Sequence, residues 1–245
     1  MTFAHGSGRM GPDHGTPEVA KFLLPRYNRG VTTIPENPST DPIWLHWAQQ
    51  LQAIAQSGLA FSKDPYDRER YEQVRELAAE IMARQGQADK EQLVALFSAE
   101  GGYATPKVDV RGVVFDNAGR LLLVRELADG GWTLPGGWVD VGEPPSLAVE
   151  REVREESGYV VRACKLLAVY DRSMHGHPPY PFHAYKLFIR CQLLGGQAET
   201  SLETGGAEFF ARDQLPPLSL MRTTPQQLER MFAHFDHPEW PADFD

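Results

Sequence analysis

Three glutamates between residues 137 and 159 are the positions in this sequence best suited to chemistry. Glu152, Glu155 and Glu156 fall in a stretch whose pattern predicts a helix over about 145–157. In a helix of that geometry the three side chains share an arc of about 100° on one face. Like charges this close repel, and carboxylate oxygens are ligands that Mg2+ and Mn2+ prefer. The spacing therefore predicts a site for a hard divalent metal ion.

Glycines and a proline bracket this predicted helix in an order that is hard to obtain by chance. The segment Leu134-Pro135-Gly136-Gly137-Trp138 interrupts a strand with residues that let the backbone approach a ligand closely. Glu143 stands at the helix entrance and Gly158 at its exit. A glutamate-rich helix alone is usually a solvated surface, so the flanking order is what favours a functional motif.

The stretch Gly137-x5-Glu143-x7-Arg151-Glu152-Val153-x-Glu155-Glu156-x-Gly158-Tyr159 resembles the signature of the Nudix hydrolase superfamily. It departs in its last position, where Tyr159 replaces a small aliphatic residue. The resemblance implies an α/β/α sandwich with a mixed sheet, and a hydrolase that cleaves a pyrophosphate linkage with Mg2+ or Mn2+. By position it assigns metal binding to the helix glutamates and one backbone carbonyl: Glu152, Glu155, Glu156 and Gly136. Arg151 would orient these glutamates, and Gly137, Glu143 and Gly158 would have structural roles.

Hydrolysis by an activated water requires a general base, and the sequence offers several acidic residues. Glu152 is one candidate. Glu199, Glu203 and Glu208 lie on a Gly-rich segment before or at a late strand, where Nudix proteins often carry another acidic residue. We favour Glu203 among these.

Substrate contacts are expected from two loops. Arg125, Glu126 and Trp132 follow a predicted strand and precede the Gly-Gly turn, and Trp132 could stack on a base. His175 and His177 lie in a proline-rich loop, where they could contact a phosphate or a base. Each of these residues also has an ordinary structural interpretation, as packing at the edge of a cleft or as an exposed loop side chain.

Composition sets the broad class of the protein. The 245 residues are 42% apolar and 23% charged, as in a globular protein, and no apolar run is long enough to cross a bilayer. The absence of a secretory signal pattern and the two cysteines, Cys164 and Cys191, predict a cytoplasmic location. The net charge of −9 disfavours a broad nucleic-acid surface but suits a site that recruits metal ions.

The hydrophobic pattern predicts three parts: a flexible tail over residues 1–41, a helical domain over 42–100, and an α+β catalytic domain over 105–240. Helices are expected to begin at Asp41-Pro42, ending near Gly58, at Asp64-Pro65 and near Asp89. The later part should contain a strand over 108–115, a turn and a returning strand over 121–124, and further strands and a closing helix: 160–170, 184–194, 207–211 and 224–235.

The region 44–83 is similar to an N-terminal helical domain found on a bacterial subset of Nudix proteins that includes CDP-choline pyrophosphatases. The segments Tyr170-Asp171-Arg172-x-x-His175-Gly176-His177-Pro178 and Pro217-Leu218-Ser219-x-x-Arg222-Thr223 also look like that subset, which adds Arg172 to the predicted substrate contacts. The resemblance favours a CDP-choline-like substrate. The aromatic residues of the helices favour a homodimer.

Three alternatives remain open from the sequence. The substrate could be ADP-ribose or another NDP-sugar rather than a CDP-choline-like compound. The enzyme could process an RNA end, although the acidic net charge counts against this. The chain could also be a non-catalytic Nudix-fold ligand sensor, but such proteins usually lose glutamates that are all present here.

Overall fold

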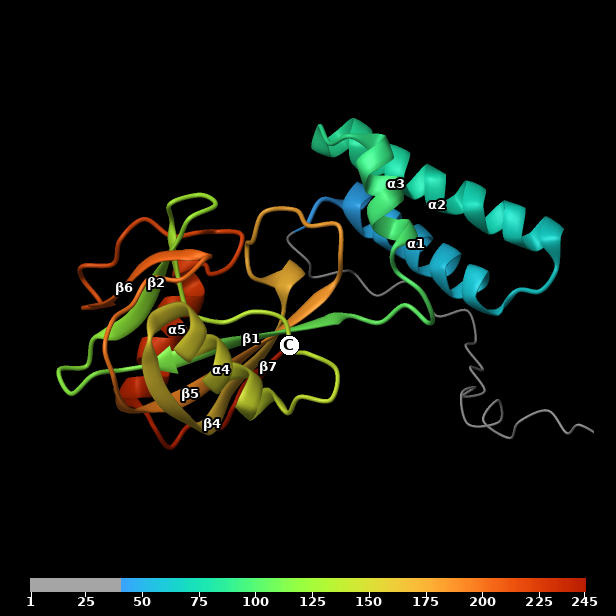
Figure 1. Cartoon of the computed structure of the whole chain (residues 1–245). Coiled ribbons are helices and arrows are strands. Elements are labelled where there is room, and N and C mark those ends of the chain that lie inside the picture. Colours follow the sequence, from blue (N-terminus) through green and yellow to red (C-terminus); the bar gives the residue numbers. More distant parts are fainter. Residues whose placement is uncertain (1–40) are drawn as a thin grey trace, which may run out of the picture. The chain divides into compact units, whose positions relative to one another are not determined.

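The computed structural model describes residues 41–245, so the tail predicted for residues 1–41 lies outside the described residues except at Asp41. The first elements are the helices α1 (Ile43–Phe61), α2 (Pro65–Gly86) and α3 (Lys90–Ser98), which lie together (Figure 1). Their buried apolar side chains form a small core. Asp64 and Asp89 cap α2 and α3 by accepting backbone N–H bonds, as their positions before the helices predict. No helix within residues 41–245 combines the length and apolarity needed to span a membrane.

The predicted end of α1 at Gly58 is wrong. The helix continues for another turn to Phe61. A Cβ atom at position 58 would lie 2.4 Å from the ring of Tyr71 on α2. Gly58 therefore allows two helices to approach closely instead of ending the first one.

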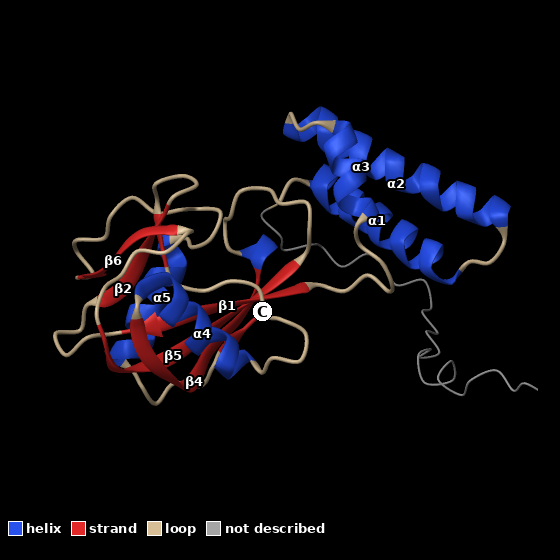
Figure 2. Ribbon diagram, in the orientation of Figure 1, coloured by secondary structure: helices blue, strands red, loops and turns tan. Residues whose placement is uncertain are grey.

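The strands form two sheets (Figure 2). A four-stranded mixed sheet has the order β1-β5-β4-β7, with bounds Lys107–Val114, Ala184–Gly196, Tyr159–Asp171 and Asp243–Phe244. A three-stranded antiparallel sheet has the order β3-β2-β6, with bounds Trp132–Thr133, Leu121–Glu126 and Thr204–Phe210. Helix α4 (Pro145–Ser157), the short 3-10 helix η2 (Arg172–Met174) and helix α5 (Pro225–Asp236) complete the domain.

The strand expected to return beside β1 pairs elsewhere. Beyond the turn, one bridge joins Phe115 to Leu121, after which β2 pairs with β3 and β6. Along its whole length β1 pairs with β5 in parallel. The two strands separate because each is buried on both faces and is completed by partners from later in the chain.

Side chains of the strands alternate between two cores. In β2, Leu121 and Leu123 pack in a core with α5, whereas Leu122 and Val124 pack in a core with α4. The strand period of two thus places a helix on each face. The α/β/α sandwich with a mixed sheet, preceded by helices, is confirmed.

Helix α4 approaches strand β1 closely where Val149 and Val153 are fully buried. A Cβ atom at Gly112 of β1 would lie 2.4 Å from a methyl group of Val153. The glycine leaves room for the valine, and this contact fixes the helix that carries the three glutamates.

We predict that Val153→Ala lowers the free energy of unfolding by about 1–3 kcal/mol, because it removes two buried carbons beside Gly112. Urea denaturation measures the change. Arg154→Ala, at the exposed next position of α4, is the control and should change stability by less than about 0.5 kcal/mol. Equal effects of the two variants would contradict this packing role.

Candidate active site

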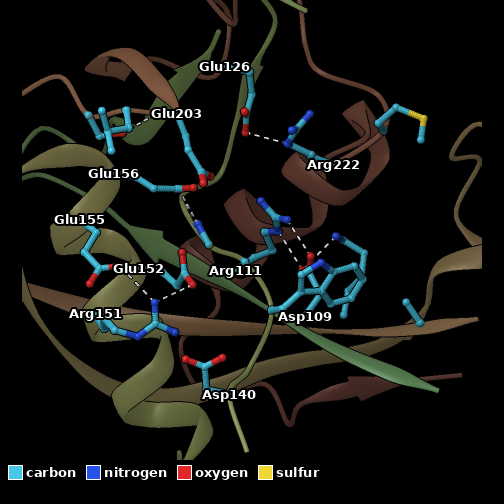
Figure 3. Close-up of a pocket in the computed structure, with 18 of the residues that line it drawn as sticks. Asp109, Arg111, Glu126, Asp140, Arg151, Glu152, Glu155, Glu156, Glu203 and Arg222 are labelled. Atoms are coloured by element: carbon cyan, nitrogen blue, oxygen red, sulfur yellow. Dashed lines mark hydrogen bonds and ion pairs between the residues drawn. The ribbon is translucent and has the colours of Figure 1, made fainter. Parts of the chain in front are cut away.

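A cavity of about 930 Å³ opens where the glutamate face of α4 meets the ends of several strands. Helix α4 contributes Arg151, Glu152, Glu155 and Glu156 to its wall, and the loop before the helix contributes Gly136 and Gly137. Glu126 from β2 and Glu203 from the loop before β6 line the same cavity. Figure 3 shows the carboxylates of Glu156 and Glu203 directed toward one another.

Arg151 binds three carboxylates, of which those of Glu152 and Glu155 line the cavity. Its guanidinium donates to both oxygens of Glu143, at 3.0 and 2.9 Å, and to Glu152 and Glu155 at 2.9 and 3.1 Å. The hydrogen bonds from Arg151 lower the pKa of Glu143. Arg151 therefore connects the helix entrance to the two glutamates.

Glu156 is the most buried of the three helix glutamates, with 8% of its surface exposed. One of its oxygens accepts a 2.8 Å bond from the backbone N–H of Gly136. Burial raises the pKa of Glu156 to about 8, even though Arg111 and the Gly136 N–H favour the charged form. Burial also raises the pKa of Glu152. Both carboxyl groups would gain from a nearby cation.

Two glycines make this arrangement possible. Gly136 has a φ of +145°, and a Cβ atom there would lie 2.0 Å from the carbonyl oxygen of Val110. A Cβ atom at Gly137 would lie 3.0 Å from both carboxylate oxygens of Glu152. The Gly-Gly pair therefore lets the loop fit between strand β1 and the glutamate face of α4.

Two further glutamates, Glu126 and Glu203, line the cavity from elements other than α4. Glu126 is buried and bonds Arg222 at 2.7 Å, and burial raises its pKa despite that charge. Of the three late glutamates considered as a base, Glu203 lines the cavity, whereas Glu199 and Glu208 are outside its lining.

A buried charged group that the sequence did not predict lies farther along the cavity. Asp109 and Arg111 of β1 and Lys186 of β5 are each at most 5% exposed, and all three line the cavity. The sequence does contain a signal for this group: Asp109 and Arg111 are charged residues two positions apart in an apolar strand, so their side chains share one face. Locating that face required the register that pairs Asp109 with Lys186.

The predicted substrate contacts divide between two places. Arg172 lines the cavity. Arg125 donates to the carbonyl of Gly130, and Trp132 packs edge-on against Phe210, both outside the cavity lining.

The two loop histidines are also outside that lining, and each has protein partners. His175 bonds the carboxylate of Asp245 at 3.0 Å and stacks on Tyr170. His177 is buried, donates from Nδ1 to the Leu220 carbonyl and contacts Gln227 through Nε2. Burial lowers the pKa of His177 to about 3.

The chemistry of the donor set fits a hard divalent cation. Within the described residues no three His, Cys, Asp or Glu side chains already enclose a metal position, and the helix glutamates are held by Arg151 and by the Gly136 N–H. The cavity nevertheless gathers oxygen donors of one kind, several of them buried with raised pKa values. Such groups are suited to Mg2+ or Mn2+.

Comparison with known proteins identifies this architecture. Residues 42–97 match the family described as UDP-X-like, N-terminal oligomerisation domain, and residues 105–235 match the NUDIX domain. A relative from Bacillus subtilis (strain 168), provisionally named ADP-ribose pyrophosphatase YjhB, is 51% identical over 202 residues, covering 82% of this chain and 97% of the relative. The chain belongs to the Nudix hydrolase family.

Two solved structures resemble this Nudix hydrolase. A UDP-X diphosphatase is 34% identical with a TM-score of 0.54, covering 83% of this chain and 98% of that one. An ADP-ribose pyrophosphatase from Streptococcus suis 89-1591 is 39% identical with a TM-score of 0.53, covering 58% of this chain and 100% of that one. The expectation of a Nudix enzyme with an additional N-terminal helical region is confirmed.

The raised pKa of Glu156 predicts a pH-dependent stability of the metal-free protein. Between about pH 4.5 and pH 8 the unfolded carboxyl is ionised while the folded one keeps its proton, so stability falls as pH rises. Glu156→Gln removes this effect. In EDTA, the variant should gain more than about 1 kcal/mol relative to the wild type between about pH 5 and pH 8.

Urea denaturation at a series of pH values measures this difference. Glu150→Gln is a matched control on α4, where the carboxylate accepts from the Ala163 N–H and lies outside the cavity lining. A constant difference between Glu156→Gln and the wild type at all pH values would show that Glu156 ionises normally.

Proposed function

We propose that this Nudix hydrolase cleaves the pyrophosphate linkage of a nucleoside diphosphate joined to a second moiety, and that it uses Mg2+ or Mn2+. The supporting observation is the cavity wall on which Glu152, Glu155 and Glu156 of α4 face Glu126 and Glu203. The products would be a nucleoside monophosphate and the phosphorylated second moiety.

Metal binding is proposed for the three helix glutamates and the carbonyl of Gly136. When bound, a divalent ion neutralises phosphoryl charge and makes a coordinated water more acidic. The chain contributes the positioning. Arg151 orients Glu152 and Glu155 through direct bonds, while the N–H of Gly136 orients Glu156.

For the general base we propose Glu203, with Glu152 as the alternative. Glu203 lies across the cavity from α4. Its backbone N–H donates to the hydroxyl of Ser201, and its carbonyl accepts from the Leu127 N–H. Glu152 is the alternative because burial raises its pKa, although one of its oxygens already accepts a bond from Arg151.

Among substrates, the relatives favour ADP-ribose first. Two relatives carry the name ADP-ribose pyrophosphatase: the Bacillus subtilis protein, provisionally, and a protein from Methanocaldococcus jannaschii. The second is 32% identical over 123 residues, covering 48% of this chain and 69% of that protein. The UDP-X diphosphatase structure favours UDP-linked compounds second. CDP-choline, expected from the helices at 44–83, is retained as a third substrate to test.

We also propose that helices α1 and α2 mediate a homodimer. Their described surface exposes several large apolar side chains, which water solvates poorly: Ile43, Trp47, Ile54, Phe61 and Leu77. The family description of residues 42–97 as an oligomerisation domain supports this assignment.

The substrate class can be tested with ADP-ribose, a UDP-sugar, CDP-choline and 5′-triphosphate RNA, each with Mg2+ or Mn2+. We expect release of a nucleoside monophosphate from at least one of the three diphosphate compounds. Glu156→Gln should lower kcat at least about 100-fold, because a carboxylate proposed to hold the metal is lost.

Glu150→Gln should retain the wild-type rate, since it changes the same helix on its other side. Chromatographic analysis of the products identifies the bond that is cut. Absence of turnover on all three diphosphate compounds, or an active Glu156→Gln enzyme, would contradict the proposed function.

A further inference from the structure

The cavity has a second region whose charge is opposite to that of the glutamate wall. Lys186 of β5 pairs in register with Asp109 of β1, and Arg111 lies two residues farther along the same strand. Arg172 of η2 lines the cavity with them. Three cationic side chains, each at most 6% exposed, therefore gather in one part of the cavity wall.

One carboxylate serves two of these cations. Arg111 donates to both oxygens of Asp109, at 2.8 and 2.6 Å, and Lys186 donates to one of them at 3.0 Å. Arg111 also bonds the carbonyl of Leu134. An ammonium group has three donors, so Lys186 can bond further acceptors in the cavity while keeping its contact with Asp109.

Arg172 adds a third positive charge. Its guanidinium lies 4.9 Å from the centre of the Tyr180 ring and donates to the carbonyl of Met221 at the long distance of 3.4 Å. The negative charge of Asp41 also acts on it. The three cations exceed by one the two carboxylates of this region, Asp41 and Asp109. The next charges that act on Arg111 are those of Glu156 and Glu126 in the glutamate wall.

Burial of an excess positive charge is costly unless an anion compensates it. Burial lowers the pKa of Lys186 to about 7, although Asp109 favours its charged form. A buried ammonium close to losing its proton would gain from an additional negative charge. Arg111 also acts electrostatically on Glu152 and Glu156, so the cationic region and the glutamate wall are close enough to act on one substrate.

We propose that Lys186, Arg172 and Arg111 form an anion-binding subsite that holds a phosphoryl group of the substrate without a metal ion. The assignment to a substrate phosphoryl group rests on the proposed function, which supplies two such groups in one molecule. A tetrahedral group with several oxygens matches a guanidinium and an ammonium that converge from different strands. The glutamate wall would repel the same group in the absence of metal.

Sulfate in the presence of EDTA tests the subsite separately from catalysis. Calorimetric titration of the full chain should show saturable sulfate binding. Lys186→Gln and Arg172→Gln should each weaken it at least about 10-fold, whereas Lys186→Arg should retain it. Lys90→Gln and Arg120→Gln serve as matched controls, because each removes a positive charge from an ion pair outside the cavity.

The outcomes separate the two proposals. Saturable sulfate binding that depends on Lys186 and Arg172, together with sulfate competition against the substrate, supports the subsite. No saturable binding by the wild type, or unchanged binding in both Gln variants, overturns it even if hydrolysis is observed. Sulfate binding without hydrolysis of any nucleoside diphosphate compound would instead contradict the proposed function. Arg172→Gln keeps the test valid if Lys186→Gln does not fold.

The pH dependence gives a second readout. Sulfate keeps its charge throughout the neutral range, so a change in its affinity reports on the protein. The test uses a Glu156→Gln background, because the Glu156 carboxyl group would otherwise ionise over the same pH range. In this background the affinity should fall as pH rises from about 6 to about 8.5 while Lys186 loses its proton, and Lys186→Arg should flatten the profile. The neighbouring Asp109, Arg111 and Arg172 keep their charge over this range, and His177 remains neutral because burial lowers its pKa to about 3. A profile unchanged by Lys186→Arg would overturn the role of Lys186.

Discussion

Five glutamates open onto one part of a cavity, and their mutual repulsion in a partly buried wall has to be reduced before the fold can hold them there: Glu126, Glu152, Glu155, Glu156 and Glu203. Arg151 and Arg222 reduce it with charge, and the N–H of Gly136 reduces it with a hydrogen bond. Burial, together with a smaller contribution from Glu152 and Glu126, still raises the pKa of Glu156 to about 8. A divalent cation would stabilise the ionised form of these partly buried carboxyl groups, and this is the physical origin of the affinity that the wall should have for it.

Much of the fold could be predicted from the sequence because its signals are local. Asp64 and Asp89 lie directly before the helices they cap, and α4 has the predicted bounds of about 145–157. The separation of β1 and β2 into different sheets was missed, since the partners of both strands come from much later in the chain. Gly58 was misjudged for a similar reason, because its role depends on Tyr71 in another helix.

The candidate site divides in the same way. The Gly-Gly pair, Arg151 and the helix glutamates all lie within residues 136–156. The motif and the helix periodicity are therefore enough to predict that they come together. The buried group of Asp109, Arg111 and Lys186 depends on the register between two strands about 75 residues apart, which no local pattern specifies. The loop residues His175 and His177 looked functional from their type, but tertiary contacts with Asp245 and Gln227 hold them outside the cavity lining.

The two parts of the cavity differ in how they are encoded. Most glutamates of the wall come from one short stretch of sequence, whereas Arg111, Arg172 and Lys186 come from three separate segments. Substitutions in those segments can alter the cationic region while the backbone of α4 and its glycine loop stay in place. In such a scaffold the strength with which a phosphoryl group is held can therefore change while the carboxylates proposed to bind the metal keep their positions.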